Sequence, residues 1–341
     1  MSWFDPPQMM TRQITLMEKR SDLERSIREF FWNLGYREVR TPMIVQSPGM
    51  EPHIRPFELH GPDGTPPRFL PTSPEFGMKK LLAKGMPRIF QICSSFRNEP
   101  RSPEHHPEFT MLEFYETNLS LEGLQDRVET LFCNLALRTH QSLRFESAGR
   151  TLSLEGPWRR FRVVDLFLHH LGVNLRELTE ARTLAELCRR HGLAAEDHEP
   201  WDDLYFKLWL NLIEPKLPEH EAFFVTHYPL SQSSLCNPVL DETGFAWANR
   251  FEVYVGRTEL GNAFDELRDP AKQRLNFEKD QKIRKETYGS DWPESPIDEE
   301  LLTAIERMPP TSGIAIGLDR LFMILFGART IDEVLYLPSH A

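Results

Sequence analysis

The chain has 341 residues, of which 40% are hydrophobic, enough for one large domain or two ordinary ones. Its formal charge of -11 argues against extended, charge-driven nucleic-acid binding, which needs clustered Lys and Arg. The longest apolar run, residues 321–326, is far shorter than the roughly 20 residues that span a bilayer, and the first ten residues lack the features of a signal peptide, so we expect a cytoplasmic protein.

The N-terminal third predicts two helices with a strand between them. Apolar residues recur at helical spacing from Leu16 to Leu34, and Gly35 stands where that helix should end. Residues 36–45 predict a strand, in which Pro42 suits an edge or an interface. A turn is expected over residues 61–67. A second helix should begin near residues 73–75, where Ser, Pro and Glu are typical of a helix start.

Residues 88–117 predict an antiparallel hairpin that carries polar side chains on one face. Strand side chains alternate between faces, so Arg97 and Glu99 share a face with Gln91, Cys93 and Ser95. In the second run, one face holds Phe109, Met111, Glu113 and Tyr115. A loop of about nine residues joins the two runs, which favours a hairpin.

The middle of the chain, residues 121–218, has helical periodicity and predicts a helical insertion. Strand signals return at residues 222–230 and 249–256. These later strands carry acidic side chains, as the hairpin does. We therefore expect that strands from both halves of the chain form one sheet.

The second acidic strand pair repeats the pattern of the first. Glu252 and Tyr254 alternate with apolar residues, and after a turn at residues 256–257 come Glu259 and then, with equal parity, Asn262, Phe264 and Glu266. Carboxylates on an inner strand surface are costly unless they meet a cation or a ligand proton. The alternative is a solvated sheet face; the interleaved aromatic residues and glycines favour a lined pocket.

The C-terminal stretch TSGIAIGLDRLFM, residues 311–323, places Gly313, Ala315 and Gly317 on one strand face, with Arg320 at the start of the next helix. Such a face offers a shallow floor for a flat ligand, or alternatively permits close backbone packing. It is no dinucleotide-binding fingerprint, because the third glycine is missing. The four cysteines form no CxxC pair, which argues against a disulfide frame and a zinc site.

Three of these stretches together resemble the signature motifs of class II aminoacyl-tRNA synthetases, in particular the lysyl branch. GYREVRTPMI resembles motif 1, the segment from FRNE to PEFTMLEFY resembles motif 2, and GIAIGLDRLFM resembles motif 3. TSPE, RFEVY and ELGNAFDEL are similar to the lysyl-type pocket in order and spacing. The resemblance implies an α+β fold, an antiparallel sheet flanked by helices, in one catalytic domain over residues 1–341. Pro42 in motif 1 implies a homodimer.

Lysyl-tRNA synthetases carry an anticodon-binding barrel before this domain, whereas about ten residues precede the first helix here. The chain is therefore similar to the elongation factor P lysine ligase family, whose members attach lysine, preferably (R)-β-lysine, to a lysine of that factor. Ala315 supports this choice, since the lysyl-tRNA synthetases usually have glycine there. The implied activity is ATP-dependent and AMP-forming, with Mg²⁺, and the implied partner is elongation factor P, with no stable tRNA partner and no membrane.

The resemblance also implies residue roles. Arg97 and Arg320 would be catalytic, and Phe109 would stack under adenine. The nucleotide site would comprise Arg97, Asn98, Glu99, His106, Phe109, Glu259, Leu260, Gly317 and Arg320. The amino-acid site would comprise Ser73, Glu75, Glu113, Tyr115, Asn262, Phe264, Glu266 and Ala315. Mg²⁺ would be held by Glu252 and Glu259, as a hard cation prefers oxygen ligands.

The motif 2 loop departs from the family pattern. His106 stands where lysyl-type enzymes usually have Asn, and Glu104 stands where the synthetases often have a phosphate-binding Arg. Arg101 and His105 could supply that contact, and the adjacent histidines could alternatively suggest a metal site. Two other functions stay open: a tRNA-aminoacylating enzyme that uses the acceptor end alone, and a catalytically silent paralogue acting as a regulatory module.

Overall fold

A computed structural model describes residues 7–62, 64–289 and 292–338. Within them, both halves of the chain build one nine-stranded sheet, as expected. Its order is β1 (Arg37–Glu38), β4 (Arg88–Phe96), β5 (Glu108–Thr117), β13 (Thr311–Gly317), β12 (Thr258–Asp265), β11 (Ala246–Val255), β9 (Ala222–Pro229) and β8 (Arg159–Arg162), with β10 (Pro238–Leu240) also paired to β11. The β1–β4 and β8–β9 pairs are parallel and the others antiparallel. The chain thus has the α+β fold with a mainly antiparallel sheet that the resemblance implied.

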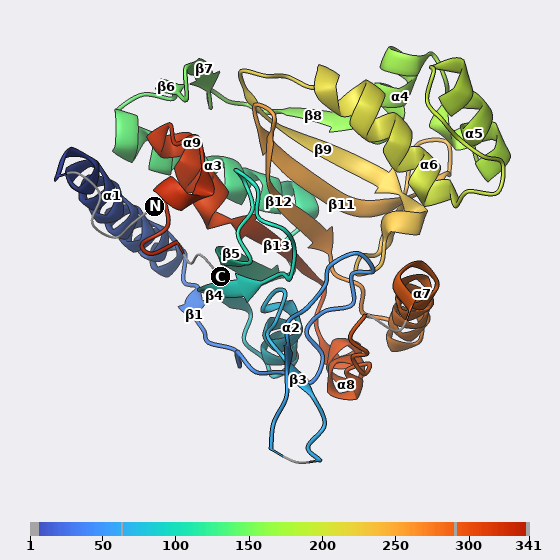
Figure 1. Ribbon diagram of the computed structural model, residues 1–341, viewed down its shortest axis with the longest axis horizontal. Helices are drawn as coiled ribbons and strands as arrows, with labels where there is room; N and C mark the ends of the chain where they lie inside the picture. Colours follow the sequence, from blue (N-terminus) through green and yellow to red (C-terminus); the bar gives the residue numbers. More distant parts are fainter. Residues whose placement is uncertain (1–6, 63, 290–291, 339–341) are drawn as a thin grey trace.

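Three helices cover one face of the sheet: α1 (Pro7–Asn33), α3 (Leu121–His140) and α9 (Leu318–Phe326) (Figure 1). They bury Phe90 and Phe114 of the hairpin and Ile314 and Ile316 of β13 in the main hydrophobic core. These strand residues are the apolar half of the alternation in the sequence. The polar half therefore lies on the opposite sheet face, where α2 (Glu75–Ala83), α7 (Pro270–Tyr288) and α8 (Glu299–Arg307) pack together at one end.

The expected helical insertion over residues 121–218 is only partly helical. It also contains β6 (Arg144–Ser147), β7 (Arg150–Ser153) and β8, and α3 belongs to the main core. A second core forms around α4 (Val163–Leu171), α5 (Ala181–Arg190) and α6 (Trp201–Leu208), packed on β9 and β11. The described residues also contain short helical segments: η1 (Leu175–Glu177), η2 (Trp209–Ile213), η3 (Glu214–Lys216), η4 (Leu230–Gln232) and η6 (Ile331–Glu333).

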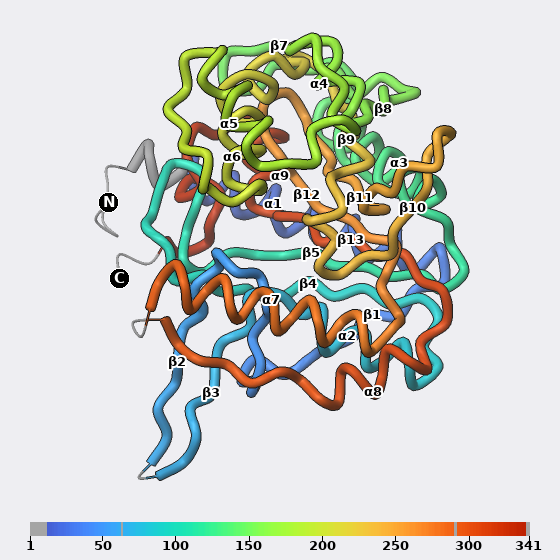
Figure 2. The backbone as a smooth tube through the Cα atoms, turned by 90° about the vertical axis from the view of Figure 1, so that its right-hand side faces the viewer, coloured from blue at the N-terminus to red at the C-terminus, as the bar shows by residue number. Residues whose placement is uncertain are grey.

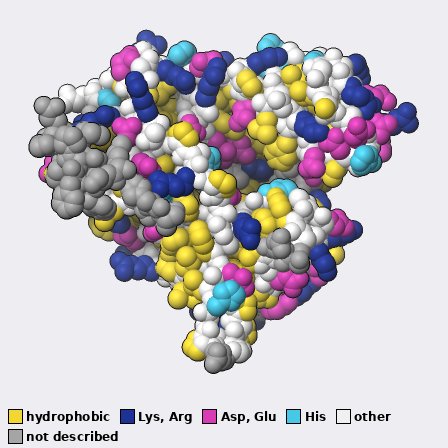
Figure 3. Space-filling view, in the orientation of Figure 1, with side chains coloured by type: hydrophobic (Ala, Val, Ile, Leu, Met, Phe, Trp, Pro, Cys, Tyr) yellow, Lys and Arg dark blue, Asp and Glu magenta, His cyan; other side chains and the backbone are white. Residues whose placement is uncertain are grey.

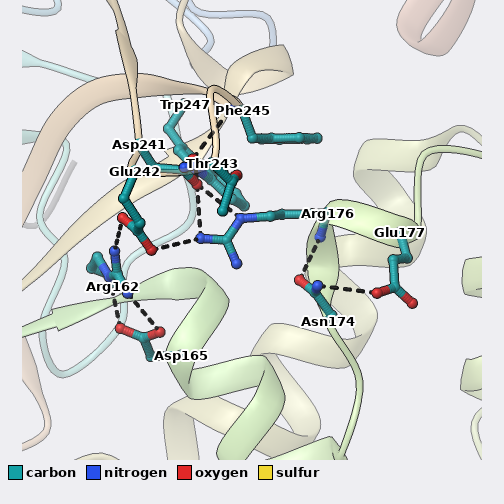
Figure 4. Close-up of polar contacts among 10 residues, drawn as sticks. All are labelled: Arg162, Asp165, Asn174, Arg176, Glu177, Asp241, Glu242, Thr243, Phe245 and Trp247. Atoms are coloured by element: carbon teal, nitrogen blue, oxygen red, sulfur yellow. Dashed lines mark hydrogen bonds and ion pairs between the residues drawn. The ribbon is translucent and has the colours of Figure 1, made fainter.

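Ion pairs join this second core to the β10–β11 turn (Figure 4). Arg162 contacts Glu242 at 2.8 Å, and Arg176 Nε donates to Asp241 Oδ2 at 2.8 Å. Trp247 Nε1 donates to the same oxygen at 2.7 Å. The helices of the second core are therefore anchored next to β11, the strand that carries Glu252.

The strand expected over residues 36–45 is wrong in length, because only Arg37–Glu38 pairs as β1. Pro42 has no N–H to donate to a ladder, and the N–H of Thr41 is bound at 3.0 Å by the Gln91 side chain instead. The turn expected over residues 61–67 lies between β2 (Glu58–Leu59) and β3 (Arg68–Phe69), which form a hairpin that projects from the rest of the molecule (Figure 2). Residue 63 of this turn lies outside the described residues.

No helix among residues 7–62, 64–289 and 292–338 is long and apolar enough to cross a membrane. All four cysteines are free thiols, as expected from their scattered positions.

Candidate active site

Strand β13 forms the floor of the site and sets the order of its parts. Gly317 pairs with Met111. Ala315 lies between Glu113 of β5 and Asn262 of β12, and Gly313 lies between Tyr115 and Phe264. Since residues two apart on a strand share a face, the three small residues run from a mouth at Gly317 to a deep end at Gly313.

The mouth is a cavity of about 360 Å³ on the polar sheet face. Most residues expected at the nucleotide site line it, together with both expected Mg²⁺ ligands and two residues expected for the amino acid: Arg97, Glu99, His106, Phe109, Glu252, Glu259, Leu260, Asn262, Ala315, Gly317 and Arg320. Acidic side chains are visible in the hollow near the centre of this face (Figure 3). Asn98 is exposed and does not line the cavity, and the side chain of Leu260 lies in the main core on the other sheet face.

Two guanidinium groups face this cavity. The Arg97 guanidinium carbon lies 5.1 Å from the centroid of the Phe109 ring, and Arg97 Nε is buried without a hydrogen-bond partner. Arg320 Nη1 donates to the carbonyl oxygen of Glu259 at 3.2 Å, and Arg320 Nη2 lies 2.6 Å from His105 Nε2. A buried guanidinium nitrogen with no acceptor fits an anionic ligand, such as a phosphate or carboxylate.

Two carboxylates of the cavity, Glu252 and Glu259, lie on neighbouring strands. Glu252 accepts from Tyr228 at 2.5 Å and Tyr254 at 2.8 Å, and Arg250 contacts it at 2.5 Å. Burial and then repulsion from Glu252 raise the pKa of Glu259. Arg250, two residues before Glu252 on the same strand face, is a site residue that the sequence analysis missed.

An irregularity in strand pairing brings Glu259 to this face. Tyr254 pairs with Glu259 while Val253 pairs with Gly261, so Leu260 is an extra residue in β12. Such a bulge reverses the alternation locally. Glu259 can therefore share the face of Asn262 although the two positions differ in parity.

The deep end is a buried cluster of acids from three elements. Glu113 of β5 and Glu266, just after β12, are fully buried at 0% exposure, and Glu75 of α2 is 7% exposed. Tyr115 donates to Glu113 at 2.8 Å, and Ser73 accepts from the Glu75 N–H at 3.1 Å. The solvated-face alternative is therefore wrong for these acids.

Phe264 does not line the mouth cavity and packs between two apolar clusters.

Burial changes the chemistry of these carboxylates. It raises the pKa of Glu113 to about 8 and also raises that of Glu266. Glu113 Oε1 and Glu266 Oε1 have no hydrogen-bond partner. A Cβ at Gly313 would lie 2.2 Å from the Tyr115 ring and 2.7 Å from Glu266 Oε1, so only glycine permits this arrangement.

Two further charged residues at the deep end escaped the sequence analysis. Lys79 of α2 contacts Glu75 at 2.5 Å and Glu266 at 2.6 Å. Glu51, from the loop before β2, is half-buried, and desolvation and then repulsion from Glu75 raise its pKa. The spacing of Glu75 and Lys79, four residues apart on a predicted helix, was a signal for the first contact.

The motif 2 loop residues lie at the rim of the mouth. Arg101 contacts both carboxylate oxygens of Asp332, at 2.7 and 2.8 Å, which directs its guanidinium toward η6. His105 contacts Arg320, as above, whereas His106 is buried with Nδ1 2.5 Å from the Glu108 carbonyl oxygen. Of the loop residues considered for a phosphate contact, His105 is therefore the one placed beside Arg320.

Comparisons with known proteins show the family of the chain. A family model described as tRNA synthetases class II (D, K and N) matches residues 8–341. An elongation factor P--(R)-beta-lysine ligase of Edwardsiella ictaluri is 38% identical over 322 residues, which cover 93% of each chain.

Lysine--tRNA ligases are similar as well. That of Mycoplasma pneumoniae is 32% identical over 96% of this chain, and that of Coxiella burnetii is 33% identical over 95%. The matches span only 65% and 64% of those two relatives, so the likeness is to part of each longer protein.

Proposed function

The chain belongs to the class II tRNA synthetases of the D, K and N group, and from this membership we propose that it is an ATP-dependent ligase that activates a lysine and transfers it to a lysine side chain of elongation factor P. The relative that matches over nearly its whole length carries this activity in its name.

The observation that carries the proposal is the buried cluster of acids at the deep end. Within the part of the chain that the structure describes, Lys79 supplies the one ammonium group in contact with Glu75 and Glu266. Glu113 and Glu266 each keep an oxygen without a hydrogen-bond partner. Buried, unpaired charge is unfavourable unless a ligand of opposite charge arrives. An amino acid with two ammonium groups meets this requirement, and its carboxylate would lie toward Arg97.

ATP would occupy the mouth. Adenine would stack on Phe109, with Arg320 on the opposite side and Gly317 leaving room below. The unpartnered Arg97 nitrogen would hold the α-phosphate and the substrate carboxylate together.

Glu252 and Glu259 would hold Mg²⁺, which when bound neutralises charge on the phosphates. The repulsion between them fits a shared cation. Among the described residues no group of three or more His, Cys, Asp or Glu could hold a metal alone, so phosphate oxygens and water would complete the coordination, as is usual for Mg²⁺.

The reaction would have two steps. An oxygen of the amino-acid carboxylate attacks the α-phosphorus of ATP, the bond to the β-phosphate oxygen breaks, and pyrophosphate leaves. The neutral ε-amine of the acceptor lysine then attacks the acyl carbon, AMP leaves, and the amine loses a proton as the amide forms. Arg97 and Arg320 contribute by positioning and by stabilising charge, so no protein nucleophile is needed.

The preferred substrate would be (R)-β-lysine. The Ala315 methyl group lies between Glu113 and Asn262, at the junction of mouth and deep end. A methyl group there reshapes the floor where the substrate's carboxylate and its nearer amino group would meet. The active form would be a homodimer, which rests on the likeness to motif 1.

One experiment tests the proposal. The protein is incubated with ATP, Mg²⁺ and either α-lysine or (R)-β-lysine, and elongation factor P or tRNA is added. Mass spectrometry of both acceptors is expected to show one lysine added to the factor and none to the tRNA. Charged tRNA with unmodified factor would identify a synthetase instead. No lysine-dependent exchange of pyrophosphate into ATP would favour the silent paralogue.

A further inference from the structure

Lys79 is a buried ammonium group inside the amino-acid end of the site. Its side chain is 1% exposed, and Nζ lies 2.5 Å from Glu75 Oε1 and 2.6 Å from Glu266 Oε2. Glu75 precedes it by one helical turn on α2, whereas Glu266 follows β12. The ammonium group thus ties two acids from separate elements into one arrangement.

The acids around Lys79 outnumber the ammonium groups that contact them. Among the described residues, Glu75 and Glu266 contact one ammonium group, that of Lys79, and Glu113 lies beside them. The other titratable groups near these three acids are Glu51, Cys93, Tyr115, Cys236 and Asp265. With the three acids ionised, two negative charges remain after Lys79 is counted. A diamino acid brings two positive charges at its amino groups, which would match the two negative charges that remain on the three acids and Lys79.

The charge of Lys79 does not need a ligand to balance it, because the ammonium group already contacts two carboxylates of the protein, Glu75 and Glu266. Glu113 Oε1 and Glu266 Oε1, by contrast, have no hydrogen-bond partner. The Lys79 contact fixes one oxygen each of Glu75 and Glu266, and so leaves the free oxygens in defined places for the ligand.

We propose that Lys79 is a positioning residue that sets substrate specificity: its ammonium holds Glu75 and Glu266 in place and adjusts the charge of the pocket to match an amino acid with two amino groups. This inference rests on the proposed function. It assigns Lys79 no contact with ATP and no part in bond making.

Lysine-dependent exchange of pyrophosphate into ATP tests the proposal with Lys79→Gln and Lys79→Arg. Gln keeps hydrogen-bonding capacity without charge, and Arg keeps the charge. For Lys79→Gln the KM for lysine at pH 7 should rise at least about 30-fold, as expected when one member of a buried charge pair is removed. The KM for ATP should stay within about twofold, and the preference for lysine over norleucine should fall, whereas Lys79→Arg should retain most of it.

The pH profile separates positioning from a merely structural role. Lys79 lowers the pKa of Glu266, so its loss should leave the Glu266 carboxyl group protonated to higher pH. The deficit of Lys79→Gln in the KM for lysine should therefore shrink as pH rises from 7 to 9. A helix that only docks poorly would give the same deficit at every pH and would affect ATP as well.

Lys80→Gln is the matched control, because the neighbouring Lys80 pairs with Asp298 at 2.8 Å on a more exposed surface. It should leave all constants unchanged. A Lys79→Gln enzyme with a KM for lysine within threefold of wild type, or a deficit independent of pH, would overturn the proposal, as would a folded Lys79→Arg enzyme without lysine preference. A wild-type protein without lysine-dependent exchange would instead sink the proposed function.

Discussion

At the scale of single residues, the two ends of the site differ in their charged groups. The mouth holds the guanidinium groups of Arg97 and Arg320, whereas the deep end holds the buried acids Glu113 and Glu266. In the proposed function, the first pair would receive an anionic ligand and the second a cationic one. Since charge in a buried place acts more strongly than charge in water, substitutions at the two ends should affect different substrates.

Replacing Glu266 by Gln tests this separation. The change keeps the size of the side chain but removes a buried negative charge, which should raise the KM for lysine by about 100-fold. ATP binding should change by less than about threefold, because Glu266 does not line the mouth. Pyrophosphate exchange gives both constants, with Glu299→Gln, an exposed partner of Arg274, as the control. Equal losses for ATP and lysine would show that the amino-acid end is misplaced.

The raised pKa of Glu113 predicts how lysine use depends on pH. Its carboxyl group must be ionised to receive an ammonium group, and burial raises its pKa to about 8. As pH rises from about 6.5 to 8.5, the ionised fraction increases, so the KM for lysine should fall; above about pH 9 the substrate amines begin to lose their own charge. Glu113→Gln should make this slope shallower, leaving the part that Glu266 contributes, and a wild-type KM that rises over this range would contradict the assignment.

At the scale of elements, alternation along strands allowed the faces of β4, β5, β11 and β13 to be predicted from sequence. Their apolar residues lie in the main core, and their polar residues lie on the site face. Two features had no such signal. The bulge at Leu260 depends on pairing with β11, and the contact of Lys79 with Glu266 joins segments far apart in the chain. Spacing alone does not determine register or long-range ion pairs.

A buried ion pair joins α1 to α9. Arg20 contacts Asp319 at 2.6 Å, the Val334 carbonyl oxygen at 2.7 Å and Thr110 at 2.7 Å. Asp319 also accepts from the Thr110 N–H at 2.5 Å, next to the nucleotide cavity.

Arg20→Met should lower the free energy of unfolding by about 3–5 kcal/mol, because it leaves Asp319 buried without its cation. Urea denaturation followed by circular dichroism measures this loss. The control is Arg25→Met, whose exposed pair with Asp22 should matter by no more than about 0.5 kcal/mol. A loss for Arg20→Met as small as for Arg25→Met would mean that the ion pair does not secure α1.

At the scale of the whole molecule, the chain leaves large apolar side chains exposed in its N-terminal region. Ile14 and Trp32 on α1 are each 52% exposed, and Ile44 is 61% exposed. Ile14 and Trp32 are eighteen residues apart, which is five turns of about 3.6 residues, so they lie on the same side of the helix. Single exposed apolar residues are common, but this helix and the segment after it are where motif 1 implies a dimer contact.

We therefore expect the protein to be a homodimer, with twice the mass of one chain in light scattering. Trp32→Glu combined with Ile44→Glu should shift the protein to monomer, because a charge in an apolar interface is buried without a partner. Leu240→Glu is the control, since Leu240 on β10 is even more exposed, at 67%, but lies outside the motif 1 region. A wild-type monomer at micromolar concentration, or dissociation caused equally by Leu240→Glu, would show that the apolar side of α1 is not the interface.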